Sequence, residues 1–443
     1  MPYTGNNEVS LLFGFSLINC WFTKLSKIVI LILTLIVLYI SKNRLISESA
    51  FNCAIEFPLV IGFSVLFMFF LTSTYDFFGI YLALEGLSLT LYVLAGILNQ
   101  SIISVESAIK YFSLGAISSG ILLFGISFLF GIVGSLDFLE VQLFLGTSSQ
   151  NFVLFFETKM AVICILFGFF FKLSAFPCHW WVADVYEGIW SPVTAFFAIV
   201  VKVALFLFFF RLLYNVLFNI LFVFQPILIF VSIGSMFVGT FGALKQVRVK
   251  RFIAYASISQ VGFIMLGLAS CCIGGLIASV LYLFIYALMS IVFFALILNT
   301  EHIVSKKNII YLSELYCFSL YSSKFAKYLA IVLFSMAGIP PLGGFISKLF
   351  VYIVAIDAKL DLIVFVSLFL SVVSTYYYLN FIHYIWFVKF NVLRLYFFKL
   401  NFFLDLILEV IVIFLIFFVV VSPYFLQVAT NFALSCTWPF IFN

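Results

Sequence analysis

The chain has 443 residues, of which 66% are apolar, and its 22 Lys and Arg together with its 17 Asp and Glu make up only 9% of the sequence. Soluble domains carry about 25% charged residues, so this chain has too few charges to cover a surface that faces water. That composition excludes a cytosolic enzyme, a nucleic-acid-binding protein and a disordered scaffold in spite of the net charge of +5. The sequence therefore predicts an all-α integral membrane protein.

Long apolar segments follow one another along the chain, and they are continuous rather than alternating, which sets a transmembrane β-barrel aside. Besides the eleven segments given at the end of this paragraph, a twelfth, 28–41, is short for a bilayer, and a thirteenth, 9–23, is doubtful as a span. The outer faces of 191–213 and 360–388 are expected to meet lipid or sister subunits. Eleven segments are predicted as membrane-spanning helices by length: 54–74, 76–98, 109–133, 157–180, 191–213, 220–243, 252–270, 272–299, 326–356, 360–388 and 403–427.

Positive charges distribute unequally between the two sides that these spans define. Side A, where the C-terminus is predicted to lie, receives five cations: Lys24, Lys27, Lys159, Arg211 and Lys359. The opposite side, side B, receives more cations and therefore faces the cytoplasm or the matrix by the positive-inside rule. Side B receives fourteen: Lys42, Arg44, Lys110, Lys245, Arg248, Lys250, Arg251, Lys306, Lys307, Lys324, Lys327, Lys389, Arg394 and Lys399.

Four charged residues lie deep inside the predicted spans, whereas the other charges lie in loops or near span ends. They are Glu85, Lys172, Lys202 and Lys348. A charge at the membrane centre costs about 2.5–3.5 kcal/mol on insertion scales, so such residues mark functional sites more often than passive ones. A structural salt bridge between Glu85 and Lys172 would leave two lysines unexplained. A buried lysine that gains and loses a proton as its partner moves would explain the set, so a proton relay is the favoured hypothesis.

Helix breakers accompany two of these lysines. Pro177 follows Lys172 by five residues, and Pro340 and Pro341 precede Lys348. Proline removes an intrahelical hydrogen bond and clashes with the preceding turn, so both spans are predicted to be interrupted within the membrane. Two interruptions, each beside a buried lysine, favour paired ion sites in related halves of a transporter.

Other polar residues favour simpler interpretations. Glu106 and Lys110 have the i, i+4 spacing of an interfacial ion pair. The basic segment KQVRVKR is expected to anchor the chain at the lipid surface; its cations are Lys245, Arg248, Lys250 and Arg251. The three histidines lie near span ends and are not spaced as metal ligands, and the sequence assigns them no role; they are His179, His302 and His383.

Motifs for cofactor binding are absent from the sequence. The eight cysteines are scattered without a CxxC pair. No dinucleotide, P-loop, zinc-protease or nucleophile-elbow motif occurs. The sequence therefore predicts no metal, no flavin, no bound nucleotide and no nucleic-acid partner.

Several segments resemble the antiporter-like membrane subunits of respiratory complex I. The most specific starts at Phe171 and reads FKLSAFPCHWWVADVYEGIWSPVTAFFAIVVKVALF, which contains Lys172 and Lys202. LALEGLSLTLY surrounds Glu85, KRFIAYASISQVGFIMLGL follows from Lys250, and LFSMAGIPPLGGFISKLF ends beside Lys348. Together with a segment that starts at Glu106, they cover roughly 76–350 in the order of the family.

The resemblance implies two inverted five-helix repeats, each with one broken helix. It divides the chain into N-terminal helices at 1–53, a first repeat at 54–213, a second repeat at 214–388, and a C-terminal helix and tail at 389–443. It makes Glu85 the carboxylate paired with Lys172, Lys202 the connecting lysine, and Lys348 the lysine of the second broken helix. Such subunits carry no redox cofactor, and they move protons while a neighbouring part of the complex reduces quinone.

The expected partners are the other membrane-arm subunits and membrane lipids. The 63 phenylalanines are typical of an AT-rich organellar genome, which favours the mitochondrial inner membrane over a bacterial plasma membrane. Three alternatives stay open: a stand-alone cation/proton antiporter, another antiporter-like subunit of the same complex, and a purely structural membrane scaffold. The last would have to accommodate three buried lysines without moving ions.

Overall fold

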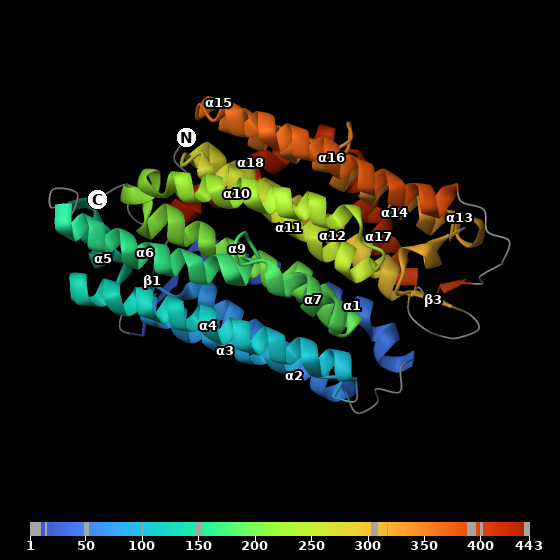
Figure 1. Cartoon of the computed structure of the whole chain (residues 1–443), viewed down its shortest axis with the longest axis horizontal. Helices are drawn as coiled ribbons and strands as arrows, with labels where there is room; N and C mark the ends of the chain where they lie inside the picture. The colour runs from blue at the N-terminus through green and yellow to red at the C-terminus, as the bar shows by residue number, and fades with distance from the viewer. Residues whose placement is uncertain are drawn as a thin grey trace.

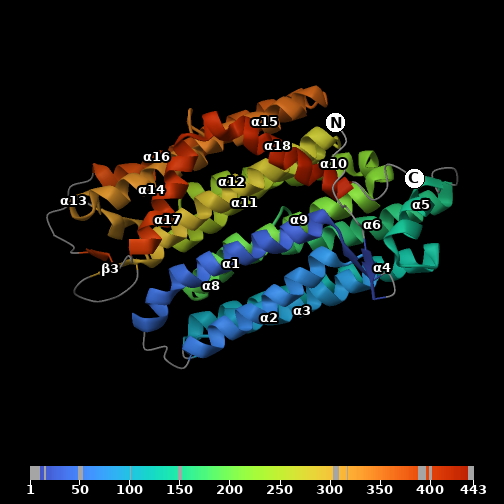
Figure 2. The ribbon, with the colours of Figure 1, turned by 180° about the vertical axis from the view of Figure 1, so that it is seen from behind.

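The computed structural model describes residues 10–13, 16–47, 53–99, 101–147, 152–302, 309–316, 318–387, 396–398 and 402–437. This part of the chain is an all-α bundle whose helices run roughly parallel or antiparallel to one another (Figure 1). Helices α2 to α4 form one edge, α10 to α12 lie in the middle, and α14 to α16 form the other edge. Seen from behind, α1, α17 and α18 lie across the opposite face (Figure 2).

The bundle is built from long helices and from shorter helical pieces. The long helices are α1 (Trp21–Ser47), α2 (Cys53–Ser73), α3 (Phe77–Ala95), α4 (Ile102–Val133), α6 (Phe152–Leu173), α10 (Leu221–Leu244), α11 (Val249–Ala269), α12 (Ile273–Leu298), α16 (Asp361–Trp386) and α18 (Phe418–Thr437). The shorter ones are α5 (Phe138–Thr147), α7 (Trp180–Gly188), α8 (Ser191–Phe196), α9 (Lys202–Arg211), α13 (Phe318–Tyr321), α14 (Ser323–Ala337), α15 (Gly343–Asp357) and α17 (Phe402–Ile416).

Four short strands form two antiparallel pairs. Strand β1 (Ser10–Leu12) pairs with β2 (Leu17–Asn19), and β3 (Thr300–His302) pairs with β4 (Tyr396–Phe398). The described residues of the segment 9–23 therefore form a strand pair and the start of α1, so the doubtful thirteenth span is not a membrane-spanning helix. The short span at 28–41 lies inside α1, whose 27 residues cover about 40 Å, enough to cross a bilayer.

Ten helices in the described part of the chain are long and apolar enough to cross a membrane. Two further passes are made by interrupted helices, α6 with α7 and α14 with α15. The predicted all-α integral membrane fold is confirmed, with twelve passes within the described residues.

The pass from Ser191 to Val216 lies at the centre of the bundle. It runs through α8, the π-helical segment η2 (Phe197–Val201), α9 and the π-helical segment η3 (Leu212–Val216). Every residue from Pro192 to Leu217 is buried, because α1, α2, α6 and α12 pack around this pass. The prediction that 191–213 presents an outer face to lipid is therefore wrong. Helix α16 does present one, on which Leu362 is 75% and Phe365 74% exposed.

Both predicted interruptions are confirmed. Helix α6 ends at Leu173 and α7 begins at Trp180, with Pro177 between them. The indole Nε1 of Trp181 donates to the carbonyl oxygen of Phe171 at 3.1 Å, which satisfies one acceptor freed by the break. In the second case α14 ends at Ala337 and α15 begins at Gly343. There Gly344 packs so closely on the Ser335 carbonyl that a Cβ would collide with it.

Two cations that lie at helix ends, as predicted, are also buried. The Arg44 guanidinium reaches the carbonyl oxygens of Leu298 and Thr300 at the end of α12. Arg211 is 1% exposed and donates to the carbonyl oxygen of Thr72 at 2.9 Å, at the end of α2. A cation at a helix C-terminus meets unpaired carbonyls and the negative end of the helix dipole, which compensates for its burial. Five cations of the side B set lie outside the described residues: Lys306, Lys307, Lys389, Arg394 and Lys399.

Candidate functional site

Lys172 and Lys202 line one small cavity in the middle of the bundle. Lys172 comes from the last turn of α6, and Lys202 from the first turn of α9. The cavity has a volume of about 20 Å³, which is enough for one water molecule. Its other polar lining comes from Ser88, Tyr111 and Tyr186. The tertiary fold thus brings together two lysines that are thirty residues apart in the sequence.

The Lys172 ammonium is buried without a hydrogen-bond partner in the described structure. Its Nζ has no accessible surface and no acceptor, although the stem of the side chain is partly exposed. The Nζ lies 5.9 Å from the centroid of the Tyr92 ring, which offers a weak cation–π contact. An ammonium with three donors and no acceptor calls for a water molecule, which the adjoining cavity can hold.

Glu85 lies beside this cavity but does not form an ion pair with Lys172. The residues of α3 that line the cavity include Leu84, Leu87 and Ser88. Glu85 is turned away from that face by about 100°, one residue along the helix. Its carboxylate is half-buried and accepts a bond of 3.4 Å from the Ser88 hydroxyl. The predicted direct pair is therefore wrong, although Glu85 remains near enough for its charge to act on Lys172.

Lys202 is 3% exposed and has a hydroxyl as acceptor. Its Nζ donates to the Oγ of Ser257 at 2.8 Å, and that hydroxyl donates in turn to the Ala254 carbonyl at 2.7 Å. The Nζ also lies 5.9 Å from the Tyr186 ring centroid. Ser257 is on α11, so this bond joins the central pass to the next helix of the bundle.

Lys348 is 4% exposed and is held by the end of the helix before the break. Its Nζ donates to the carbonyl oxygens of Met336 and Ala337, both at 3.0 Å. These two residues end α14, so the ammonium lies at the negative end of that helix dipole. The Nζ is also 4.8 Å from the Phe263 ring centroid.

Gln260 connects the surroundings of Lys202 and Lys348. It lies on α11, one turn after Ser257, and is 2% exposed. Its Nε2 donates to the Met336 carbonyl at 3.5 Å, the same oxygen that accepts from Lys348. A second cavity of about 20 Å³ lies between Ser257 and Gln260. Sequence reasoning missed both residues, and the signal was two polar residues at i, i+3 in the middle of a predicted span.

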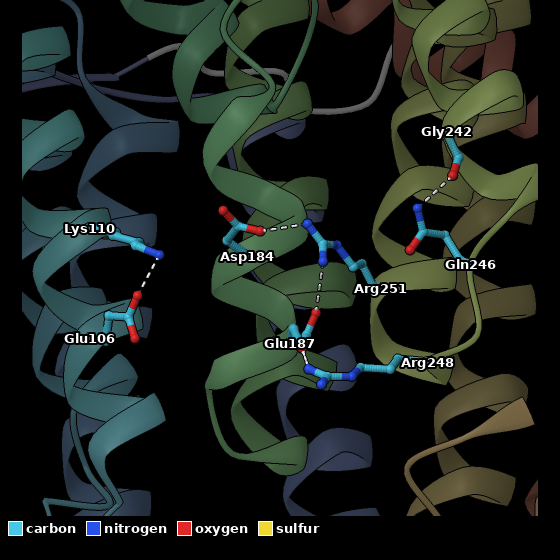
Figure 3. A network of polar contacts seen from close by, with 8 residues as sticks. All are labelled: Glu106, Lys110, Asp184, Glu187, Gly242, Gln246, Arg248 and Arg251. Atoms are coloured by element: carbon cyan, nitrogen blue, oxygen red, sulfur yellow. Dashed lines mark hydrogen bonds and ion pairs between the residues drawn. The ribbon is translucent and has the colours of Figure 1, made fainter.

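The basic segment after α10 is tied to α7 rather than to lipid. Arg251 pairs with Asp184 at 2.9 Å and with Glu187 at 3.5 Å, and Arg248 also pairs with Glu187 (Figure 3). Lys250 donates to the Ile189 carbonyl at 2.6 Å. The prediction of a lipid-facing anchor is therefore wrong for these three cations, because two carboxylates on one face of α7 neutralise the arginines.

The predicted pair of Glu106 and Lys110 is confirmed, with 2.6 Å between the charged atoms (Figure 3). Both side chains are exposed, at 59% and 49%, so solvent screens the pair and it contributes little to stability. It lines a cavity of about 170 Å³ with Asp184, Glu187 and Arg251.

The two histidine side chains in the described part of the structure contact aromatic rings. His179 lies in the break after α6 and stacks on Phe176, and His383 stacks on Phe387. The side chain of His302 and residue Cys317 lie outside the described residues. No three His, Cys, Asp or Glu side chains of the described residues are placed to ligate one metal ion.

A helical membrane protein with two interrupted helices and lysines buried beside small cavities belongs to the class of ion-translocating membrane proteins. Residues 74–374 match the family described as NADH:quinone oxidoreductase/Mrp antiporter, TM. The match covers more than half of the chain, and this chain belongs to that family.

Bacterial relatives match most of the chain. NADH-quinone oxidoreductase subunit N 1 of Rhizobium meliloti (strain 1021) is 37% identical over 389 residues, which cover 87% of this chain and 78% of the relative. NADH-quinone oxidoreductase subunit N of Pelagibacter ubique (strain HTCC1062) is 38% identical over 338 residues, which cover 76% and 69%.

Solved structures share the fold. A chain of respiratory complex I from Thermus thermophilus with bound aureothin superposes with a TM-score of 0.76 at 24% identity, covering 95% of this chain and 88% of that chain. A chain of the Mrp complex from Dietzia sp. DQ12-45-1b superposes with a TM-score of 0.81 at 19% identity, covering 96% and 85%. The fold is thus common to a respiratory complex and to a complex named for Mrp.

Proposed function

We propose that this chain is the subunit 2 or subunit N type of antiporter-like subunit and that its protons move along Glu85, Lys172, Lys202 and Lys348. The chain is a proton-translocating membrane-arm subunit of NADH:quinone oxidoreductase, and it assembles with the other membrane-arm subunits of that complex. The subunit type rests on the relatives named subunit N, and the residue roles rest on the geometry of the buried lysines.

The observation that carries the residue roles is that Lys172 and Lys202 line one cavity from two helices and that neither is part of an ion pair within the described structure. Burying an ammonium without a carboxylate destabilises the fold, and a lysine with a purely structural role offers no gain that offsets this cost. A group that must alternate between ammonium and amine cannot be held by a tight ion pair. The site is therefore suited to passing protons.

The chemistry at each lysine is proton exchange through one intervening water molecule. A charged Lys172 donates to water in the shared cavity, and a neutral Lys202 accepts through its amine lone pair. The carboxylate of Glu85 favours the charged form of Lys172 through space, so any motion of α3 changes how readily Lys172 releases its proton. Ser257 and the end of α14 hold the other two ammonium groups in place.

We extend the proposal to the organisation of the chain. The first repeat would occupy 54–213, with α6 and α7 as its broken helix, and the second 214–388, with α14 and α15. We propose that no redox cofactor binds this chain, which an absorption spectrum and metal analysis of the purified subunit would test.

The compartment is also a proposal. We propose the mitochondrial inner membrane on the phenylalanine content. The relatives named above are bacterial, so a bacterial plasma membrane is the alternative. Fractionation of the source cells, with the subunit detected by mass spectrometry, distinguishes the two membranes.

The residue roles are tested by replacing Lys172, Lys202 and Lys348 one at a time with Met, which keeps the length of the side chain and removes the charge. We expect each assembled variant to translocate fewer protons per electron pair in reconstituted vesicles. Lys359, a cation predicted for a loop on side A, is the control, and Lys359→Met should translocate normally. Normal translocation by all three assembled buried-site variants would reject the relay.

A stand-alone cation/proton antiporter is the second candidate, because the Mrp complex shares this fold. Native electrophoresis of the protein from its own membranes separates the candidates. Migration only within a very large assembly supports the respiratory subunit, and a small free oligomer supports the antiporter.

A further inference from the structure

Gln260 of α11 lies between the surroundings of Lys202 and those of Lys348. Its side chain reaches three other helices: Tyr282 of α12 donates to its Oε1, and its Nε2 lies 3.3 Å from the Tyr378 hydroxyl of α16 and 3.5 Å from the Met336 carbonyl of α14. The amide therefore uses its acceptor and both of its donors. Rotation of the Gln260 side chain would break these hydrogen bonds inside a buried site.

The orientation of this amide is fixed by chemistry. The Met336 carbonyl can only accept, so the nitrogen side of Gln260 must face it, and the oxygen side must face Tyr282. A rotated amide would set two oxygens against each other. Lys348 donates to that same Met336 carbonyl at 3.0 Å, so the position of Gln260 and the position of Lys348 depend on one acceptor.

Among the described hydrogen bonds, this amide links the cavity beside Lys202 to the Met336 carbonyl that holds Lys348, and Met336 itself also lines that cavity. From Lys202 a proton can reach Ser257 at 2.8 Å and then the cavity of about 20 Å³, which has room for one water and is also lined by Gln260, Tyr286 and Tyr378. Hydroxyls and water exchange protons by donating one and accepting another. An amide does not, since it has no group that titrates in water.

We propose that Gln260 is the gate between Lys202 and Lys348, closed in this structure, and that a proton crosses only when the side chain leaves the Met336 carbonyl. Gln260 is thus a positioning residue. It holds the hydrogen-bonded groups around Lys202 and those around Lys348 in place, and it prevents proton exchange between them. A bundle with an uninterrupted row of hydroxyls and water here would let protons leak between the two sides. The gate rests on the proposed lysine relay.

The test is the passive proton permeability of proteoliposomes that contain the assembled complex, measured with an internal pH dye under a potassium diffusion potential and without NADH. Gln260→Glu keeps the shape but can take a proton on one oxygen and release it from the other. Gln260→Asn is too short to reach Met336 and admits a second water. Both should raise permeability, by on the order of tenfold or more for the acid. Gln260→Met fills the space without carrying protons and should stay tight.

Gln225 of α10 supplies the matched control, because it is also a helical glutamine that bonds to a neighbouring helix. Its Nε2 donates to the carbonyl oxygen of Ala269, at the end of α11, at 3.0 Å. Gln225→Glu introduces an acid at a site away from the lysines, and its permeability should equal that of the parent. If Gln260→Glu and Gln260→Asn are both as tight as the parent, the gate is wrong. If Gln260→Met leaks as much as they do, the effect is a packing defect and the gate is wrong.

A double variant separates the gate from the relay. Gln260→Glu with Lys202→Met should lose the leak, because the proton must pass Lys202 to reach the gate. A leak that persists in the double variant overturns the gate. Lys202→Met and Lys348→Met alone, measured for translocation per electron pair, test the relay independently of Gln260.

Discussion

Lys348 and Met336 lie on opposite sides of the break in the second broken helix, yet the ammonium of Lys348 donates to the Met336 carbonyl at 3.0 Å. The bond exists because α14 stops at Ala337 and leaves its last carbonyls without intrahelical partners. The interruption of the helix and the burial of the lysine are therefore one arrangement. A continuous helix would have used those carbonyls and left the ammonium with no acceptor at this place.

Gly338 should be intolerant of a side chain. Its φ of +87° is in the left-handed region, and a Cβ would lie 3.0 Å from Cδ and 3.1 Å from Nζ of Lys348. Gly338→Ala should cost about 1–2 kcal/mol of stability and reduce proton translocation by displacing the ammonium. Thermal unfolding of the purified complex and vesicle assays measure the two effects. Gly131, whose Cβ would meet nothing within 4 Å, is the control, and Gly131→Ala should be neutral or slightly stabilising. Unchanged translocation in Gly338→Ala would contradict the arrangement.

Glu85 should matter for translocation more than for assembly. The carboxylate forms no ion pair with Lys172, so Glu85→Gln should avoid most of the ~3–5 kcal/mol penalty of breaking a buried pair. It removes the charge that favours the ammonium, so protons per electron pair should fall. Glu85→Asp should retain part of the activity, and Glu85→Gln with Lys172→Met should not be additively worse for stability. Glu106→Gln, at the exposed pair on side B, is the control. Full translocation by an assembled Glu85→Gln complex would reject the role of Glu85.

Ser257 should be required for its hydroxyl, because it is the hydrogen-bond acceptor of Lys202. Ser257→Ala removes that acceptor, which in a buried site costs about 1–3 kcal/mol, and translocation should fall. Ser257→Thr keeps a hydroxyl and should restore part of it. The buried Ser279 bonds locally to the Leu276 carbonyl, so Ser279→Ala should translocate normally. Equal translocation by the alanine and threonine variants at 257 would show that the hydroxyl is not used.

Arg44 should act on assembly rather than on translocation. It donates to the Leu298 and Thr300 carbonyls, and bonds to a charged group contribute about 1.5–3 kcal/mol. Arg44→Ala should therefore reduce the amount of assembled complex on native gels, while the complex that does form pumps with the parent ratio of protons to electrons. Lys42, exposed on the same helix, is the control, and Lys42→Ala should assemble normally. A reduced ratio in assembled Arg44→Ala would place Arg44 in the proton path.

The sequence by itself determined the class of protein, the passes and the charged residues inside them. Continuous apolar segments leave few choices for a chain with 9% charged residues. The prolines near Lys172 and Lys348 located both breaks, because the loss of a backbone N–H is a local effect that needs no knowledge of neighbouring helices.

Only the tertiary structure decided which polar groups meet. The face of α3 that lines the cavity carries Ser88 and not Glu85, and that depends on how α3 is rotated against its neighbours. The sequence only assigned Arg44 and Arg211 to a side of the membrane, whereas the structure shows that they reach the ends of α12 and α2, which are far away in the sequence. The hydrogen-bond partners of Gln260 come from three other helices, α12, α14 and α16. Hydropathy is a property of one segment, whereas hydrogen-bond partners are set by the packing of several. This is why the sequence located the three buried lysines but not their contacts.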